Sequence, residues 1–134
     1  MFSYIHHVGI VVPDAKIAAT EYKSTVKNER EIELEDIPSQ KVKICLIENS
    51  SICIEFIEPI DRHSPVYNFL SKGGGVHHVC YEVDDVHSSI NMLRPYAVLI
   101  AEPTVGFQNR LTAFMWMKSA AFGIRLFELA SKRS

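Results

Sequence analysis

The chain has 134 residues, of which 47% are hydrophobic and 22% charged, with a formal net charge of -2. This length fits a single domain, residues 1–134, with a substantial core. The near-neutral charge supplies no electrostatic footprint for nucleic acid or an anionic membrane, and no apolar run approaches the roughly 20 residues that span a bilayer. Three cysteines without a CxxC pair make no disulfide framework, so we expect a reducing cytoplasm.

The opening segment of the chain returns in its second half. "IHHVGIVVPD" near the start resembles "GGGVHHVCYEVDD" further on, and a shift of 71 residues aligns His7 with His78 and Asp14 with Asp85. Each Asp follows a strand pattern and precedes apolar residues at helical spacing, which predicts a helix N-cap at both positions. The sequence therefore predicts two copies of one module.

Each copy continues with strand patterns rich in β-branched and aromatic residues. We expect strands near residues 29–36, 40–48 and 51–59 in the first half, and near 97–101, 111–118 and 123–130 in the second. Residues 61–75 between them read as a short helix and a glycine-rich turn. The prediction is an α+β fold of two tandem βαβββ modules, about 1–60 and 76–134, joined by this connector.

Two histidines and two glutamates recur at matching module positions. Glu55 lies 48 residues after His7, and Glu128 lies 50 residues after His78. Both glutamates stand inside apolar strand segments, where an unpaired carboxylate is costly. By strand alternation, His6 and His77 point away from the face that carries the second histidine of each pair.

This quartet suits a divalent metal. Imidazole and carboxylate ligands bind Zn²⁺, Mn²⁺, Fe²⁺, Co²⁺ or Ni²⁺, and further open positions would admit substrate oxygens to a Lewis acid. The alternative reading is a set of hydrogen-bonded strand histidines and outward-facing glutamates. The repetition of the same residue types at the same module positions favours the metal.

The segments "HHVGIVVPD", "IEFIEPI", "SPVYNFLSKGGGVHHVCYEVDD" and "LFELA" resemble the vicinal oxygen chelate superfamily, and within it the methylmalonyl-CoA epimerases. The resemblance implies two βαβββ modules forming an open barrel-like cleft around one divalent metal, which we expect to be Co, Mn, Zn or Ni. It places the metal ligands at His7, Glu55, His78 and Glu128. The implied chemistry is stabilisation of an enolate beside a carbonyl, with Glu128 as the proton-transfer base.

Two segments depart from the epimerase pattern. Ser39 stands where the epimerases carry a further glutamate in a "PEQG"-like loop, and a serine at its ordinary pKa cannot replace a carboxylate base; only Glu35 or Asp36 lies nearby. In the late loop, "GFQNRLTAFMWMK" replaces "GAHGK…HPK", which leaves Gln108 and Lys118 as the candidate substrate-binding residues. We therefore expect a divergent member acting on an acyl thioester or α-oxo compound.

Other functions on this fold stay open at this point. A glyoxalase-like lactoylglutathione lyase needs one ligand carboxylate as its base and tolerates Ser39. A non-catalytic small-molecule-binding module of the antibiotic-resistance type has no evident need of four metal ligands, and an extradiol dioxygenase would use two histidines and one carboxylate. The resemblance also implies a homodimer.

Overall fold

The computed structural model describes residues 4–25, 30–31, 34–48 and 52–133. The chain forms two compact units, one of His7–His77 and the other of Met1–His6 with His78–Ser134. The prediction of a single domain over residues 1–134 stays a prediction.

The first module follows the predicted order. It runs β1 (Tyr4–Val11), α1 (Ala15–Thr25), β2 (Arg30–Glu31), β3 (Glu35–Ile37), a 3₁₀ turn (Pro38–Gln40), β4 (Val42–Glu48) and β5 (Cys53–Pro59). The strand order is β2-β4-β5-β1, with β3 also on β4; β1 and β5 are parallel. The strand predicted at 29–36 corresponds to two short strands, β2 and β3, and its residues 29, 32 and 33 lie outside the described residues, as does residue 51 of the strand predicted at 51–59.

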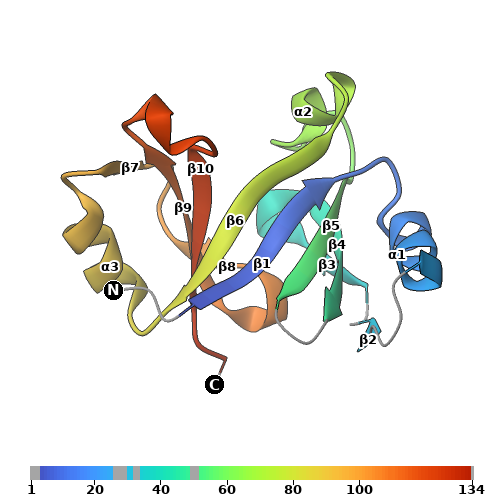
Figure 1. The fold of residues 1–134 in the computed structure, drawn as a ribbon, viewed down its shortest axis with the longest axis horizontal. Helices are drawn as coiled ribbons and strands as arrows, with labels where there is room; N and C mark the ends of the chain where they lie inside the picture. The colour runs from blue at the N-terminus through green and yellow to red at the C-terminus, as the bar shows by residue number, and fades with distance from the viewer. Residues whose placement is uncertain (1–3, 26–29, 32–33, 49–51, 134) are drawn as a thin grey trace. The chain divides into compact units, whose positions relative to one another are not determined.

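One face of this sheet packs on α1, which lies beside β4 and β5 (Figure 1). Ala15 and Ala19 of the helix meet Cys45, Ile47 and Phe56 in a buried cluster. These strand residues alternate with others that point to the opposite face, so the helix covers one side of the sheet. The predicted helix cap at Asp14 is confirmed, since its Oδ1 accepts a hydrogen bond from the Ile17 amide at 2.9 Å.

The connector contains α2 (Tyr67–Ser71) and ends in the predicted glycine turn. Gly74 has a φ of +67°, and a Cβ added there would come within 2.6 Å of the Val11 carbonyl oxygen. Only glycine meets both conditions, the left-handed backbone and the close approach to the end of β1.

The second module repeats the plan. It runs β6 (Gly75–Val83), α3 (Val86–Leu93), β7 (Ala97–Leu99), β8 (Thr104–Val105), a 3₁₀ turn (Phe107–Asn109), β9 (Leu111–Met117), a 3₁₀ turn (Ala120–Phe122) and β10 (Leu126–Ser131). The order is β6-β10-β9-β7, with β8 on β9; β6 and β10 are parallel. The last strand begins later than predicted, at Leu126, because a turn that ends at Gly123 with a φ of +92° precedes it.

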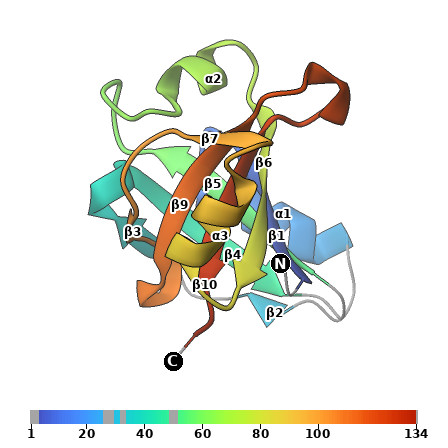
Figure 2. The same cartoon turned by 90° about the vertical axis from the view of Figure 1, so that its left-hand side faces the viewer.

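In Figure 2, α3 lies across the face of β9 and β10. Val86, Ile90 and Leu93 of the helix pack on strand residues that include Met115 and Leu129. Asp85 caps this helix as predicted, accepting from the Ser88 amide at 2.7 Å. The prediction of an α+β fold with two tandem βαβββ modules is thus confirmed, with an additional short strand in each. Among the described residues, no helix has the length and hydropathy that crossing a membrane requires.

Candidate metal centre

In the first module, His7 and Glu55 meet on the face of the sheet that α1 does not cover. His7 Nε2 lies 3.4 Å from Glu55 Oε1, and both side chains are buried. In the parallel pairing of β1 and β5, His7 stands opposite Cys53 and Gly9 stands opposite Glu55. Gly9 has no side chain, so the carboxylate of Glu55 has room to reach diagonally toward the imidazole.

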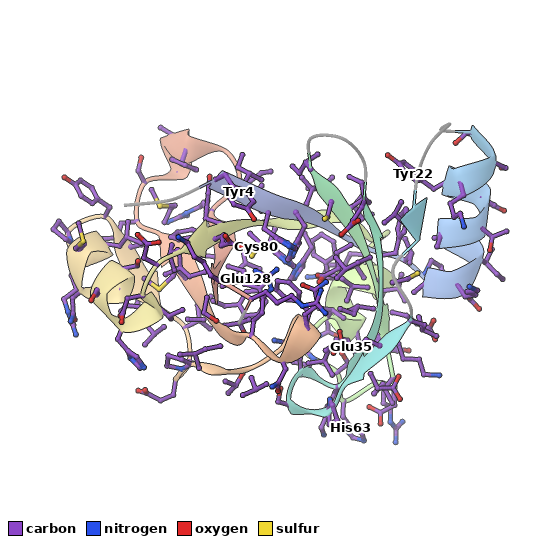
Figure 3. The ribbon with its side chains drawn as sticks, turned by 90° about the horizontal axis from the view of Figure 1, so that it is seen from below. Tyr4, Tyr22, Glu35, His63, Cys80 and Glu128 are labelled. Carbon is purple, nitrogen blue, oxygen red and sulfur yellow. The ribbon has the colours of Figure 1, made fainter. Side chains whose placement is uncertain are left out.

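The second module builds the same diagonal. His78 Nε2 lies 3.2 Å from Glu128 Oε1, again with both side chains buried. Glu128 stands opposite Cys80 in the parallel pairing of β6 and β10, two residues along the strand from His78. Figure 3 shows Cys80 and Glu128 close together on these two strands. The ring of Phe114 packs edge-on against His78, with centroids 5.2 Å apart.

The chemistry of each pair fits a metal. A buried carboxylate needs a cation or hydrogen-bond partners, and two ligands bonded to one ion at about 2.0–2.2 Å lie about 3.0–3.5 Å from each other. The separations of 3.4 Å and 3.2 Å within the two pairs fall in this range. His7 with Glu55 and His78 with Glu128 are thus two buried pairs of side chains of the kind that bind divalent metals.

The segment that departs from the epimerase pattern lies on and after β3. Ser39 is exposed, in the turn Pro38–Gln40. Glu35 is half-buried and pairs with Ile44, which in turn pairs with Ile57. Paired residues share a face, so Glu35 lies on the same face as Glu55, whereas the exposed Asp36 points to the other face. Glu35 is labelled in Figure 3.

The two predicted substrate-binding residues have different surroundings. Gln108 is half-buried and has a left-handed backbone with a φ of +52°; its Oε1 accepts a hydrogen bond from Arg110 Nε at 3.1 Å. Lys118 is exposed just beyond β9, and its Nζ donates to the Arg94 carbonyl oxygen at 2.9 Å. Contact with a substrate stays a prediction for both.

Sequence reasoning missed a buried ion pair in the second module. Arg110 Nη1 lies 2.7 Å from Glu82 Oε2, with both side chains less than a tenth exposed. Alternation along β6 offered one signal, since Glu82 falls on the same face as His78 four residues earlier. Nothing in the spacing identified Arg110 as its partner, because they are joined only when β9 and β6 are placed on either side of β10.

Comparison with known proteins agrees with this fold. Residues 6–114 match the model of the Glyoxalase/Bleomycin resistance protein/Dioxygenase superfamily. The chain is 32% identical over 123 residues to the ethylmalonyl-CoA/methylmalonyl-CoA epimerase of Cereibacter sphaeroides, covering 88% of this chain and 91% of that one.

Solved structures match over almost the whole chain. A hypothetical protein of Bacillus halodurans is 30% identical, with a TM-score of 0.86 over 97% of this chain and 94% of its own. A Streptomyces coelicolor methylmalonyl-CoA epimerase variant, solved in complex with 2-nitronate-propionyl-CoA, is 22% identical, with a TM-score of 0.84 over 100% of this chain and 97% of its own; at that identity it shows the fold alone. The chain therefore belongs to the Glyoxalase/Bleomycin resistance protein/Dioxygenase superfamily and, within it, to the methylmalonyl-CoA epimerase family of isomerases.

Proposed function

We propose that this protein is a metal-dependent epimerase that removes and returns the proton beside the carbonyl of an acyl thioester of the methylmalonyl-CoA type. The observation that carries the proposal is the buried His–Glu diagonal that each module builds in the same way. Membership of the epimerase family supports the reaction class.

His7, Glu55, His78 and Glu128 would hold one divalent ion, which we expect to be Co, Mn, Zn or Ni. A bound ion of this kind supplies Lewis acidity that stabilises the negative charge of an enolate. The burial of all four side chains excludes water from them, which strengthens their electrostatic effect on a bound substrate.

Glu128 is the proposed base. Beside an ion held by these residues, its carboxylate would lie within reach of the carbon next to the substrate's carbonyl. Its cross-strand neighbours on β6 and β9 are Cys80 and Phe114, and His78 Nε2 lies 3.2 Å from its Oε1. Glu128 would remove the proton from one face of the carbon and leave a planar enolate; a proton delivered to the opposite face by a second donor, such as solvent water, completes the epimerisation without any net change in the substrate's atoms.

The substrate would be a small molecule, an acyl thioester or an α-oxo compound, with Gln108 and Lys118 as its further contacts. The 32% identity to an ethylmalonyl-CoA/methylmalonyl-CoA epimerase supports a thioester of CoA. A homodimer is the proposed assembly, and light scattering coupled to size-exclusion chromatography would measure it directly.

The test is exchange of the α-proton of methylmalonyl-CoA with solvent deuterium, followed by NMR on protein loaded with Co²⁺ or Mn²⁺. We expect exchange by the native chain and a loss of about 10²- to 10⁴-fold in Glu128→Gln, since the amide cannot accept the proton. The matched control is Glu102→Gln, an exposed glutamate of the same module, which should exchange at the native rate. Exchange that is equal in native and Glu128→Gln protein, or absent from both, overturns the epimerase proposal.

A glyoxalase-like lyase is the second candidate. The exposed Ser39 offers no second carboxylate at its position, and this reaction needs only one ligand carboxylate as base. Loss of hemithioacetal absorbance with formation of the thioester would establish the lyase. A non-catalytic binding module would bind an acyl thioester yet catalyse neither reaction.

A further inference from the structure

We propose that Arg110 is a positioning residue for substrate binding: its buried pair with Glu82 fixes the turn Gly106–Arg110 so that Gln108 faces the substrate. This inference deepens the proposed function and rests on it for the identity of the substrate. The residues that Arg110 contacts all lie in the compact unit of Met1–His6 with His78–Ser134.

Each nitrogen of the Arg110 guanidinium group contacts another residue. Nη1 donates to Glu82 Oε2 at 2.7 Å and to the Ser131 carbonyl oxygen at 3.1 Å, and Nε donates to Gln108 Oε1 at 3.1 Å. Nη2 lies 3.4 Å from His6 Nε2. The group also lies over the ring of Phe107, 5.2 Å from its centroid. A planar fork of donors can make these contacts at once, whereas the single ammonium of a lysine cannot.

The turn that Arg110 holds has a costly backbone. Gln108 and Asn109 both have left-handed conformations, with φ values of +52° and +58°. Two successive non-glycine residues of this kind persist only where the surroundings enforce them, and such strain concentrates at ligand-binding positions. Two backbone hydrogen bonds close the turn, Gly106 N to Arg110 O at 2.8 Å and Arg110 N to Phe107 O at 3.0 Å.

The first module shows that the fold does not need this ion pair. Leu46 stands opposite Glu55 as Phe114 stands opposite Glu128, so Val42 in the first module matches Arg110 in the second. The shift of 71 residues that aligns His7 with His78 likewise aligns Val11 with Glu82. Val11 and Val42 are both buried.

Two valines therefore fill positions where the second module places two charges. Burying a carboxylate and a guanidinium carries a desolvation cost that apolar side chains avoid. We therefore attribute the charges of Glu82 and Arg110 to the turn that they hold. The first module folds with valines at the matching positions, so folding alone does not require the two charges.

Glu82 also lies on the face of the sheet that carries His78 and Glu128. Glu82 follows His78 by four residues along β6, so both side chains point to the side of the sheet that carries Glu128. The separation along the strand is about 13 Å, which an acyl thioester bound near His78 can span. Because Oε1 of Gln108 accepts from Arg110, the amide nitrogen is the end that can donate to a substrate oxygen.

The test compares single and paired substitutions. Arg110→Met leaves Glu82 buried without its cation, so unfolding alone could remove activity. The double variant Glu82→Leu with Arg110→Met removes both charges and copies the chemistry of Val11 and Val42, so its melting temperature should stay within a few °C of the native value. Arg110→Lys keeps one cation for Glu82 but loses the fork. Lys132→Met is the matched control, since it breaks the exposed ion pair with Asp84, also 2.7 Å long and in the same module.

Two readouts separate positioning from a merely structural role. Amide hydrogen exchange at Gly106 and Arg110 reports the turn itself, and KM against kcat for deuterium exchange of methylmalonyl-CoA reports its effect on the substrate. In the double variant and in Arg110→Lys, we expect amide exchange to rise at least about 10-fold, and kcat/KM to fall about 10- to 100-fold, mainly through KM. Lys132→Met should change neither.

Native amide exchange and native KM in a folded double variant would overturn the proposal, as would a loss carried wholly by kcat with the turn intact. If the double variant does not fold, Arg110→Lys decides by the same two readouts. If the native chain itself exchanges no α-proton, the epimerase proposal fails. The amide exchange at Gly106 and Arg110 then still shows whether Arg110 fixes the turn.

Discussion

The two modules reach the same His–Glu pair through different sequence spacings. Glu55 follows His7 by 48 residues and Glu128 follows His78 by 50, yet each glutamate stands opposite the residue two places after its histidine. The residue beside the glutamate differs, Gly9 in one module and Cys80 in the other. What the duplication preserves is therefore the diagonal across two parallel strands, while loop length and neighbouring side chains have changed.

Removing either histidine should have the largest effect. We expect elemental analysis of native protein to find about one divalent ion per chain, and His7→Ala and His78→Ala each to weaken metal binding by about 100-fold or more, because a ligand is lost. Equilibrium dialysis with Co²⁺ would measure the change. His77→Ala is the matched control, since His77 packs edge-on against Phe69 and lies on the other face of β6. Retention of the ion in both alanine variants would refute a site shared by the two modules.

The first module has a further carboxylate on the face of its His–Glu pair. Glu35 shares that face and Asp36 does not. If Glu35 supplies a proton-transfer group that Ser39 cannot, Glu35→Gln should slow α-proton exchange by about 10²-fold. Asp36→Asn should leave the rate unchanged. Equal rates in the two variants would remove Glu35 from the reaction, and metal content serves to check that the site itself is intact.

The difference between Gly9 and Cys80 can be tested by placing a larger side chain at residue 9 and removing the side chain at residue 80. Gly9→Leu fills the space through which Glu55 approaches His7, so we expect metal affinity to fall by about 10-fold or more. Cys80→Gly makes the second module resemble the first and should change affinity less. Calorimetric titration with Mn²⁺ would measure both. A larger loss in Cys80→Gly would mean that contact with Cys80, and not room beside it, orients Glu128.

The helix caps should give the smallest effect. The amide of Ser88 donates to Asp85 and holds the pKa of that carboxyl below its ordinary value. A lowered folded-state pKa means that the cap stabilises fully above the unfolded pKa of about 3.9 and loses its effect as pH falls through the folded value. Asp85→Ala should lower the melting temperature by a few °C at pH 7, and by less at pH 3. An equal loss at both pH values would show that the charge of Asp85 contributes nothing.

Much of this fold could be predicted from the sequence, because the internal repeat aligns the strands and helix of one module with those of the other. The His-His-Val segments located the first strand of each module, and the aspartates after them located both helix caps. The break between β2 and β3 and the late start of β10 could not be predicted, since they depend on the partner strand and on a turn ending at Gly123.

The candidate site was predictable only in part. The contacts of His7 with Glu55 and of His78 with Glu128 follow from alternation and duplication, which act along each strand. The pair of Arg110 with Glu82 joins strands that are not consecutive, and no spacing rule relates them. Likewise, the face on which Glu35 lies depends on its register with Ile44, which a three-residue strand does not reveal by its own pattern.

The close approach of Gly74 to Val11 bears on how the chain tolerates insertions. The amide of Gly74 donates to the Phe69 carbonyl oxygen at 3.0 Å, and a Cβ there would strike the end of β1. Added residues at this point would have to displace β1 just beyond His7. By contrast, Asp61, Arg62 and His63 are exposed at the start of the same connector. An affinity tag or reporter inserted between the modules therefore belongs at residues 61–63, where lengthening the chain leaves the strand that carries His7 undisturbed.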